Sequence, residues 1–155
     1  GMQCNRQQAD SRMSEFSGAW KKHKQEKWGD WVSAHGVGFP KKQIACSFIF
    51  KLKEEIEQDG DRWKLTNTDP HGPKTIEFVV GNKVKLDSVP GLGPGTANVD
   101  VETSWEEDGK VLLMQITSEN TDWTLRRFLE SPQEMCVVMK DNKANVESKR
   151  WLKKI

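Results

Sequence analysis

The fold of this chain is decided by residues 16–50, which read FSGAWKKHKQEKWGDWVSAHGVGFPKKQIACSFIF. The Phe-x-Gly-x-Trp segment at 16–20 predicts the start of a strand. Apolar and aromatic side chains then recur at positions i, i+3, i+4 and i+7, which is the spacing of one face of a short helix. These helix-face residues are Trp28, Trp31, Val32 and His35.

A second short helix is predicted directly after this one. A Gly-Val-Gly turn at 36–38 precedes Pro40, and proline suits the first position of a helix. Ile44 and Phe48 follow four residues apart, on one helical face. We therefore expect two small helices between the first strand and the rest of the chain.

After residue 50, turn signals recur at hairpin spacing. Asp59-Gly60 is a strong signal for a two-residue hairpin turn. Further breaks fall at 69–73, 81–82, 90–95, 108–109, 119–122, 131–132 and 141–145. The segments between them predict about ten short strands in up-and-down order, and such a sheet removes its exposed edges by closing. We predict an all-β fold, a ten-stranded closed barrel capped by a two-helix lid between the first and second strands.

Length and composition are compatible with one such domain. At 155 residues the chain is long enough to bury a sizeable core. We expect a flexible N-terminal tail at 1–15 and a barrel domain at 16–155. Only 35% of the residues are hydrophobic and 30% are charged. A barrel with a polar, partly wet cavity accounts for that balance, and so does a small domain with a very polar surface.

The charge balance and the cysteines exclude several classes of protein. Lys and Arg total 24 and Asp and Glu total 23, which argues against a general nucleic-acid binder. The sequence has neither a membrane-spanning run nor a secretory signal, so we expect a cytoplasmic protein. We also expect a monomer. Cys4, Cys46 and Cys136 show no metal spacing, and we expect them to be reduced. No cofactor, metal or catalytic motif is predicted, and we expect a protein that is not an enzyme.

Two arginines fall on predicted inward faces. Strand alternation places Arg127 with Leu125 and Leu129, and Arg150 with Ser148 and Leu152. A buried arginine stays charged, so it needs an anion or a dense hydrogen-bond network. Two guanidinium groups in one cavity would bind a carboxylate. Pairing with an internal Asp or Glu is the alternative, as is a one-residue slip that turns Lys149 and Trp151 inward.

Four motifs in order resemble the intracellular fatty-acid-binding proteins, of the lipid-binding family within the calycin superfamily. They are Phe-Ser-Gly-Ala-Trp at 16–20, Gly-Val-Gly-Phe at 36–39, Val-Met-Lys at 138–140 and Arg-Trp-Leu at 150–152. The resemblance runs from Phe16 to the C-terminus. It implies that Arg127 and Arg150 bind the ligand carboxylate. Leu152 departs from the family's tyrosine, and Leu129 stands where many members have another arginine.

The favoured function is a soluble intracellular carrier that binds a long-chain fatty acid or a similar hydrophobic carboxylate. Acyl-chain burial would supply about 0.8 kcal/mol per methylene. The expected cavity wall is Leu65, Ile76, Phe78, Trp105, Leu112, Met114, Ile116, Leu125, Met135, Val137 and Leu152. The expected portal is Trp28, Trp31, Val32 and His71. A secreted-type lipocalin and a non-lipid barrel that binds proteins are the alternatives.

A basic cluster surrounds the predicted lid. It comprises Lys21, Lys22, His23, Lys24, Lys27, Lys41 and Lys42. We interpret it either as a solvated face or as a contact for anionic membranes, to which each basic residue would contribute about 1 kcal/mol. In the membrane interpretation we expect Lys21, Lys22 and Lys24 to lie outside the cavity.

Overall fold

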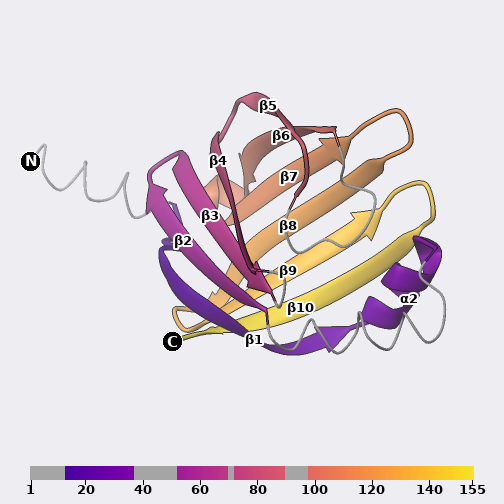
Figure 1. The fold of residues 1–155 in the computed structure, drawn as a ribbon. Coiled ribbons are helices and arrows are strands. Elements are labelled where there is room, and N and C mark those ends of the chain that lie inside the picture. Colours follow the sequence, from indigo (N-terminus) through magenta and orange to yellow (C-terminus); the bar gives the residue numbers. More distant parts are fainter. Residues whose placement is uncertain (1–12, 37–51, 70–71, 90–97) are drawn as a thin grey trace, which may run out of the picture.

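The computed structural model describes residues 13–36, 52–69, 72–89 and 98–155. Ten antiparallel strands form one sheet in the order β4-β3-β2-β1-β10-β9-β8-β7-β6-β5. The sheet curls into a nearly closed barrel (Figure 1), in which β4 and β5 are the two edges and are not paired with each other. The predicted ten-stranded up-and-down barrel is therefore confirmed, with a gap at one place in its wall.

The strand bounds follow the predicted turns closely. The strands are β1 (Gly18–Glu26), β2 (Lys53–Asp59), β3 (Arg62–Asp69), β4 (Gly72–Val79), β5 (Lys83–Leu86), β6 (Val99–Glu106), β7 (Val111–Thr117), β8 (Asp122–Ser131), β9 (Glu134–Asp141) and β10 (Val146–Lys154). The first hairpin turns at 60–61, between the paired residues Asp59 and Arg62. Gly60 has φ 60 there, a left-handed conformation that glycine adopts without steric cost.

One of the two predicted lid helices lies in the described chain. Helix α2 (Trp28–Ala34) packs beside the start of β10, at one end of the barrel (Figure 1). The second predicted helix, with Pro40, Ile44 and Phe48, lies outside the described residues. A short 3-10 turn, η2 (Glu107–Gly109), joins β6 to β7. Neither helix in the described ranges has the length and apolar composition required to cross a membrane.

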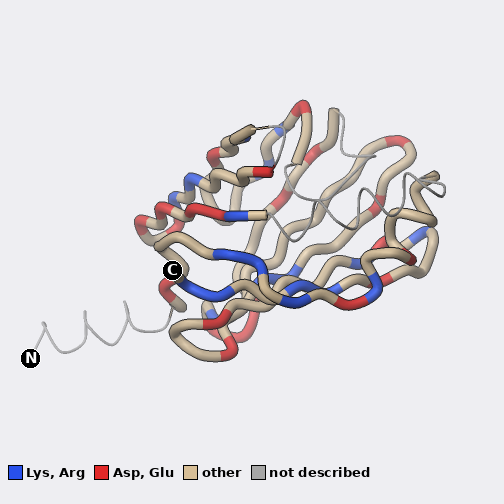
Figure 2. Tube along the Cα trace, turned by 60° about the horizontal axis from the view of Figure 1, so that its bottom comes forward, with Lys and Arg blue, Asp and Glu red and all other residues tan. Residues whose placement is uncertain are grey.

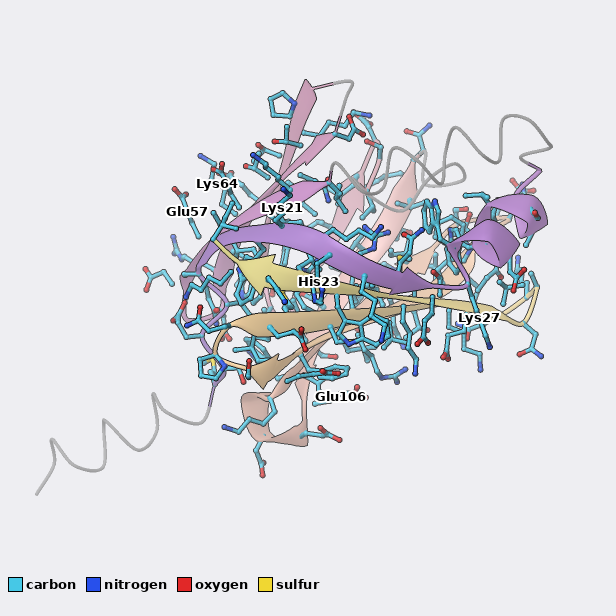
Figure 3. The ribbon with its side chains drawn as sticks, turned by 90° about the horizontal axis from the view of Figure 1, so that it is seen from below. Lys21, His23, Lys27, Glu57, Lys64 and Glu106 are labelled. Atoms are coloured by element: carbon cyan, nitrogen blue, oxygen red, sulfur yellow. The ribbon has the colours of Figure 1, made fainter. Side chains whose placement is uncertain are left out.

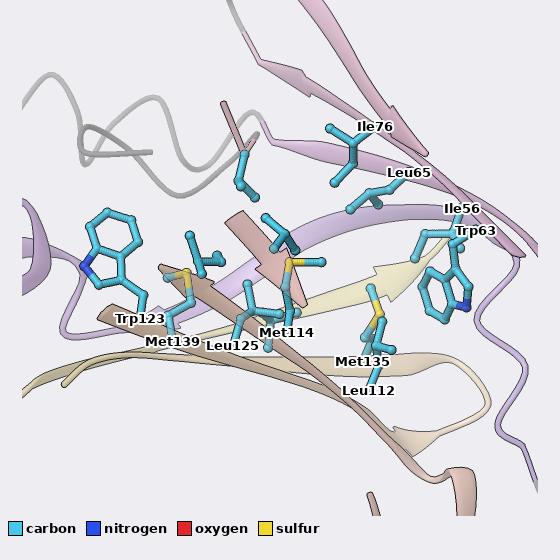
Figure 4. Packing of buried hydrophobic residues seen from close by; sticks show 14 of the residues in the cluster. Ile56, Trp63, Leu65, Ile76, Leu112, Met114, Trp123, Leu125, Met135 and Met139 are labelled. Carbon is cyan, nitrogen blue, oxygen red and sulfur yellow. The ribbon is translucent and has the colours of Figure 1, made fainter. Parts of the chain in front are cut away.

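Inward apolar side chains from all parts of the sheet form one core. Figure 4 shows them in a row between Trp123 near one end of the barrel and Trp63 near the other. Trp63 packs against the rings of Phe16 and Phe78, with ring centroids 5.2 and 5.6 Å apart. Burying a large apolar side chain stabilises the fold by about 1.5–3 kcal/mol. The barrel is thus held by its interior as well as by its strand pairing.

Strand β1 contains a bulge that changes which of its lysines face inward. Lys22 pairs with Leu152 and Lys24 pairs with Trp151, so the register shifts between them. Before the bulge Lys22 shares the inward face of Trp20, and it is only 2% exposed. After the bulge, Lys24 is exposed. The prediction that Lys22 lies outside the cavity was wrong, because strand alternation from Trp20 turns its side chain into the barrel.

Candidate functional site

Arg127 and Arg150 lie in one cross-strand row inside the barrel. Both pair in register with Val137, Arg127 from β8 and Arg150 from β10. Neighbouring strands are about 4.8 Å apart, so this pairing brings the two backbones within about 10 Å. Arg127 is 3% exposed and Arg150 is 2% exposed. The structure therefore brings the two predicted carboxylate-binding residues together.

Arg127 is paired with a buried carboxylate from across the barrel. Its Nη1 donates to Glu54 Oε2 on β2 at 2.5 Å, and the same nitrogen lies 3.4 Å from Met135 Sδ. Glu54 is itself 2% exposed, and Asn67 Nδ2 on β3 lies 3.5 Å from its other oxygen. An internal partner for one arginine was the alternative considered from the sequence, and Glu54 is that partner.

Arg150 lies under the lid helix. Its guanidinium carbon is 5.3 Å from the centroid of the Trp28 ring, a cation–π distance, and its Nη2 lies 3.4 Å from Met139 Sδ. Burial lowers the pKa of Arg150 to about 10, while Glu54 acts to raise it and Arg127 acts to lower it. The side chain therefore stays charged at neutral pH. In the opposed register the partly exposed Lys149 and Trp151 would face inward, but Arg150 and Leu152 are buried instead.

Lys22 adds a third cation to the interior. The described residues buried in the barrel include three cationic side chains, Lys22, Arg127 and Arg150. The buried acidic side chains among them are Glu54 and Asp141, and Asp141 is bonded to His35 at the lid end. Cationic groups therefore outnumber carboxylates in the interior that the structure describes. This excess of positive charge favours the binding of an anionic ligand.

Sequence reasoning missed Lys22 and Glu54, although each carried a signal. Lys22 lies two residues after the inward Trp20. Glu54 lies between Leu52 and Ile56, which are both buried, so it occupies a core position of β2. A charged residue at a position of core parity is the signal that would have found both.

The predicted apolar wall lies inside the barrel. Ten of its eleven members are buried and Trp105 is partly exposed. Met135 and Val137 on β9 lie between the two arginine-bearing strands. Trp105 is drawn toward the surface because its Nε1 donates to Asp61 Oδ1 at 2.8 Å.

The lid is fixed by contacts of α2 and His35, the residue after it, with the start of β8 and the end of β9. Trp31 and Trp123 pack edge to face with ring centroids 4.9 Å apart. His35 Nε2 lies 2.8 Å from Asp141 Oδ2, and its Nδ1 lies 2.6 Å from the carbonyl oxygen of Trp31. Trp28, Trp31 and Val32 are all buried, as a lid face requires. The remaining predicted portal residue, His71, lies outside the described residues.

A pocket of about 700 Å³ lies away from Arg127 and Arg150, beside the gap between β4 and β5. Its apolar lining includes Ile56, Trp63, Phe78 and Val84. The indole Nε1 of Trp63 is buried and has no hydrogen-bond partner among the described residues. Charged side chains also line this pocket, among them Glu57, Arg62 and Glu77, so it combines apolar and polar surface.

The described residues show no metal centre and no reactive thiol. They contain no group of three or more His, Cys, Asp or Glu side chains that could hold a metal ion. Cys136 is free and buried on β9. Burial, reinforced by the charge of Glu130, raises the pKa of this thiol to about 11. A thiol of that pKa is a poor nucleophile at neutral pH.

Comparisons with known proteins give both relatives and a shared fold. No protein-family model matches the chain. Cellular retinoic acid-binding protein 1 of Gallus gallus is 26% identical over 116 residues, covering 72% of this chain and 81% of that protein. Cellular retinoic acid-binding protein 2 of Bos taurus is 28% identical over 131 residues, covering 82% of this chain and 90% of that protein.

Solved structures share the barrel at lower identity. Fatty-acid-binding protein 1 of Echinococcus granulosus superimposes with a TM-score of 0.74 at 19% identity, covering 90% of this chain and 97% of that one. A mutant of the REP1-NXSQ fatty acid transporter gives a TM-score of 0.73 at 20% identity, with the same coverage. The fold is thus shared along nearly the whole chain.

Proposed function

Because this chain has the barrel fold of the intracellular lipid-binding proteins, we propose that it carries one hydrophobic anion inside its barrel. The ligand would be a long-chain fatty acid or a similar lipid carboxylate. Carriage rather than catalysis is the activity proposed, since the relatives are named as binding proteins. The expected setting is the cytoplasm.

One observation supports the anionic ligand most directly, namely the excess of buried cations. Lys22, Arg127 and Arg150 face an interior whose described part offers Glu54 as the nearby carboxylate. Burying a charge costs several kcal/mol unless an opposite charge or hydrogen bonds meet it. A ligand carboxylate would supply an opposite charge, and guanidinium groups bind carboxylates with favourable geometry.

The apolar wall supports a long hydrocarbon tail. Met114, Met135 and Leu112 belong to the apolar core that extends between Trp123 and Trp63 (Figure 4). Methionine is flexible and fills irregular spaces, which suits a wall that adapts to a bound chain. Each buried methylene would contribute about 0.8 kcal/mol.

The test is direct binding to purified, delipidated protein. Palmitate and retinoate are titrated in parallel, and organic extracts of the untreated protein are analysed by mass spectrometry. We expect a bound lipid acid and saturable binding of at least one of the two probes. Arg150→Gln should weaken acid binding about tenfold or more, the scale of a charge-assisted hydrogen bond. Binding of hexadecanol should change little, and equal losses for acid and alcohol would contradict a carboxylate role.

We further propose that an outer face of the barrel contacts anionic membranes. Lys53, Lys21 and Lys153 lie in one row across β2, β1 and β10, and all three are exposed. Figure 2 shows Lys and Arg recurring along β1 and β10, and Figure 3 shows Lys21, His23 and Lys27 along β1. Like charges directly opposite each other destabilise a sheet. An anionic surface would relieve that repulsion.

A further inference from the structure

Glu54 is a carboxylate in the same interior as the buried cations Lys22, Arg127 and Arg150. It occupies an inward position between two apolar residues. Leu52, directly before β2, and Ile56 on β2 are its neighbours on the same face, and both are buried. Glu54 is 2% exposed and reaches across the barrel to Arg127 on β8. A carboxylate in this place is costly unless it is bonded. Its presence changes what the site accepts.

The contacts of Glu54 leave one of its oxygens weakly occupied. Oε2 accepts from Arg127 Nη1, whereas among the described residues Oε1 has only the amide of Asn67, at 3.5 Å. An ionised carboxylate has about four lone-pair sites. Glu54 therefore retains the capacity to accept a further hydrogen bond inside the barrel.

A plain carboxylate ligand would meet a competitor in this site. To reach Arg127 it would share the guanidinium with Glu54, and two carboxylates held close together repel each other. Arg150 and Lys22 each add a positive charge to the same interior, and this charge attracts the anion. A ligand that also carries a hydrogen-bond donor could bond to Glu54 instead of only competing with it for Arg127.

We propose that Glu54 is a specificity-determining residue that favours lipid acids with a hydroxyl or amide N–H next to the carboxylate. The inference rests on the proposed carrier function. The anionic oxygen lies against the guanidinium donors of Arg127 and Arg150, and the ligand donor bonds to Glu54. Leu152 offers no hydroxyl on β10, so the polar complement for the head group comes from Glu54 and Asn67 instead.

The experiment compares three ligands that differ at one atom or group. Palmitate, α-hydroxypalmitate and α-methoxypalmitate are titrated into the wild-type protein. The methoxy compound has similar bulk but no donor. We expect α-hydroxypalmitate to bind about tenfold more tightly than either of the others, the scale of one hydrogen bond to a charged group.

A variant then assigns the preference to Glu54. Glu54→Gln should tighten palmitate about tenfold, because the like charge is gone, and should shrink the preference for the hydroxy acid. Glu55→Gln is the matched control, since Glu55 is the next residue on β2 and is exposed. It should leave all three affinities unchanged.

The outcomes separate this inference from the carrier proposal. If palmitate and α-hydroxypalmitate bind the wild-type protein equally, Glu54 does not select for a donor, although the carrier function stands. If the methoxy acid matches the hydroxy acid, the preference comes from bulk and the inference also fails. If no lipid acid binds, the carrier proposal itself is overturned. The wild-type comparison remains decisive even if Glu54→Gln does not fold.

Discussion

His35 Nε2 lies 2.8 Å from Asp141 Oδ2, and this pair joins the end of the lid helix α2 to the end of β9. The other ring nitrogen of His35 faces the carbonyl oxygen of Trp31 at 2.6 Å. Both ring nitrogens of His35 therefore face oxygen atoms of other residues. Asp141 also accepts from Trp123 Nε1 and from two backbone amides. The lid is bonded to the barrel as well as packed on it.

Acid should loosen this attachment through Asp141. Burial alone would raise the pKa of Asp141, but hydrogen bonds from Ala144, His35 and Lys143 hold it below its ordinary value of 3.8. A lowered folded-state pKa means that the stabilisation is present above pH 3.8 and is lost as pH falls through the folded-state value. Asp141→Asn should cost about 1–3 kcal/mol at neutral pH and should flatten this part of the acid limb. Urea unfolding between pH 2 and pH 7 measures it. An equal acid slope in both proteins would assign the loss to other carboxylates.

Removing either partner of the buried Glu54–Arg127 pair should destabilise the ligand-free protein more than removing both. Arg127→Met leaves Glu54 without its cation, at a cost of about 3–5 kcal/mol. Glu54→Leu should destabilise the protein by a similar amount, because it leaves the buried Arg127 without its carboxylate. The double variant should recover much of the loss, since hydrophobic replacement of a buried pair is often close to neutral. Urea unfolding of the four proteins gives the coupling, and additive losses would mean that the pair contributes no specific interaction.

Restoring a hydroxyl at Leu152 should tighten binding of lipid carboxylates. Leu152 is buried on β10, two residues after Arg150 and on the same inward face of the strand. Leu152→Tyr would add a donor, and Leu152→Phe is the matched control for the ring without the hydroxyl. The difference between the two in palmitate affinity should be about threefold to tenfold. Isothermal titration gives both affinities, and an equal affinity for Tyr and Phe would show that the hydroxyl finds no anion.

Transfer of ligand to vesicles should depend on the lysine row of β1, β2 and β10. We expect faster transfer with more anionic lipid and slower transfer with more salt, since exposed charges are screened beyond about 10 Å at 0.1 M. The triple variant Lys21→Glu, Lys53→Glu and Lys153→Glu should no longer transfer ligand faster to anionic vesicles. Its equilibrium affinity for the ligand should be unchanged. Lys64→Glu is the control, because Lys64 is exposed on β3 between Glu57 and Glu77. A transfer rate that does not depend on vesicle concentration would indicate that the ligand is released into water instead.

Cys136 should resist alkylation in the folded protein. Its pKa of about 11, raised first by burial, leaves little thiolate at pH 8, and the side chain is almost fully covered. Iodoacetamide labelling followed by peptide mass spectrometry should show modification of Cys136 only after denaturation. Rapid labelling of the native protein would mean that β9 opens locally.

The strand pattern and the arginine row could be predicted because they depend on local signals. The Asp-Gly turn at 59–60 and alternation along β8 and β10 set the inward faces of Arg127 and Arg150 without knowledge of the rest of the barrel. Retinoic acid-binding relatives and fatty-acid-binding structures agree with that fold. Alternation also predicted Leu152 correctly as a buried side chain.

The polar partners could not be predicted because they depend on distant contacts. His35 and Asp141 are separated by 106 positions, and Glu54 and Arg127 by 73. No local pattern reports which inward groups meet across a barrel. The bulge in β1 was invisible for another reason, since Lys22 and Lys24 have the same parity and only the register with β10 separates them.

The pairing of β1 with β10 has a consequence for how the molecule is made. Gly18 pairs with Ile56 on one side of β1, while Trp20 pairs with Lys154 on the other. During synthesis β10 leaves the ribosome last of the ten strands. One edge of β1, which includes Trp20, therefore has no partner strand until the other nine strands have emerged. Such non-local pairing folds slowly, and the waiting edge is prone to association with other chains. Closure of this barrel therefore requires β10 to have been synthesised, and until then the unpaired edge of β1 is open to chaperones.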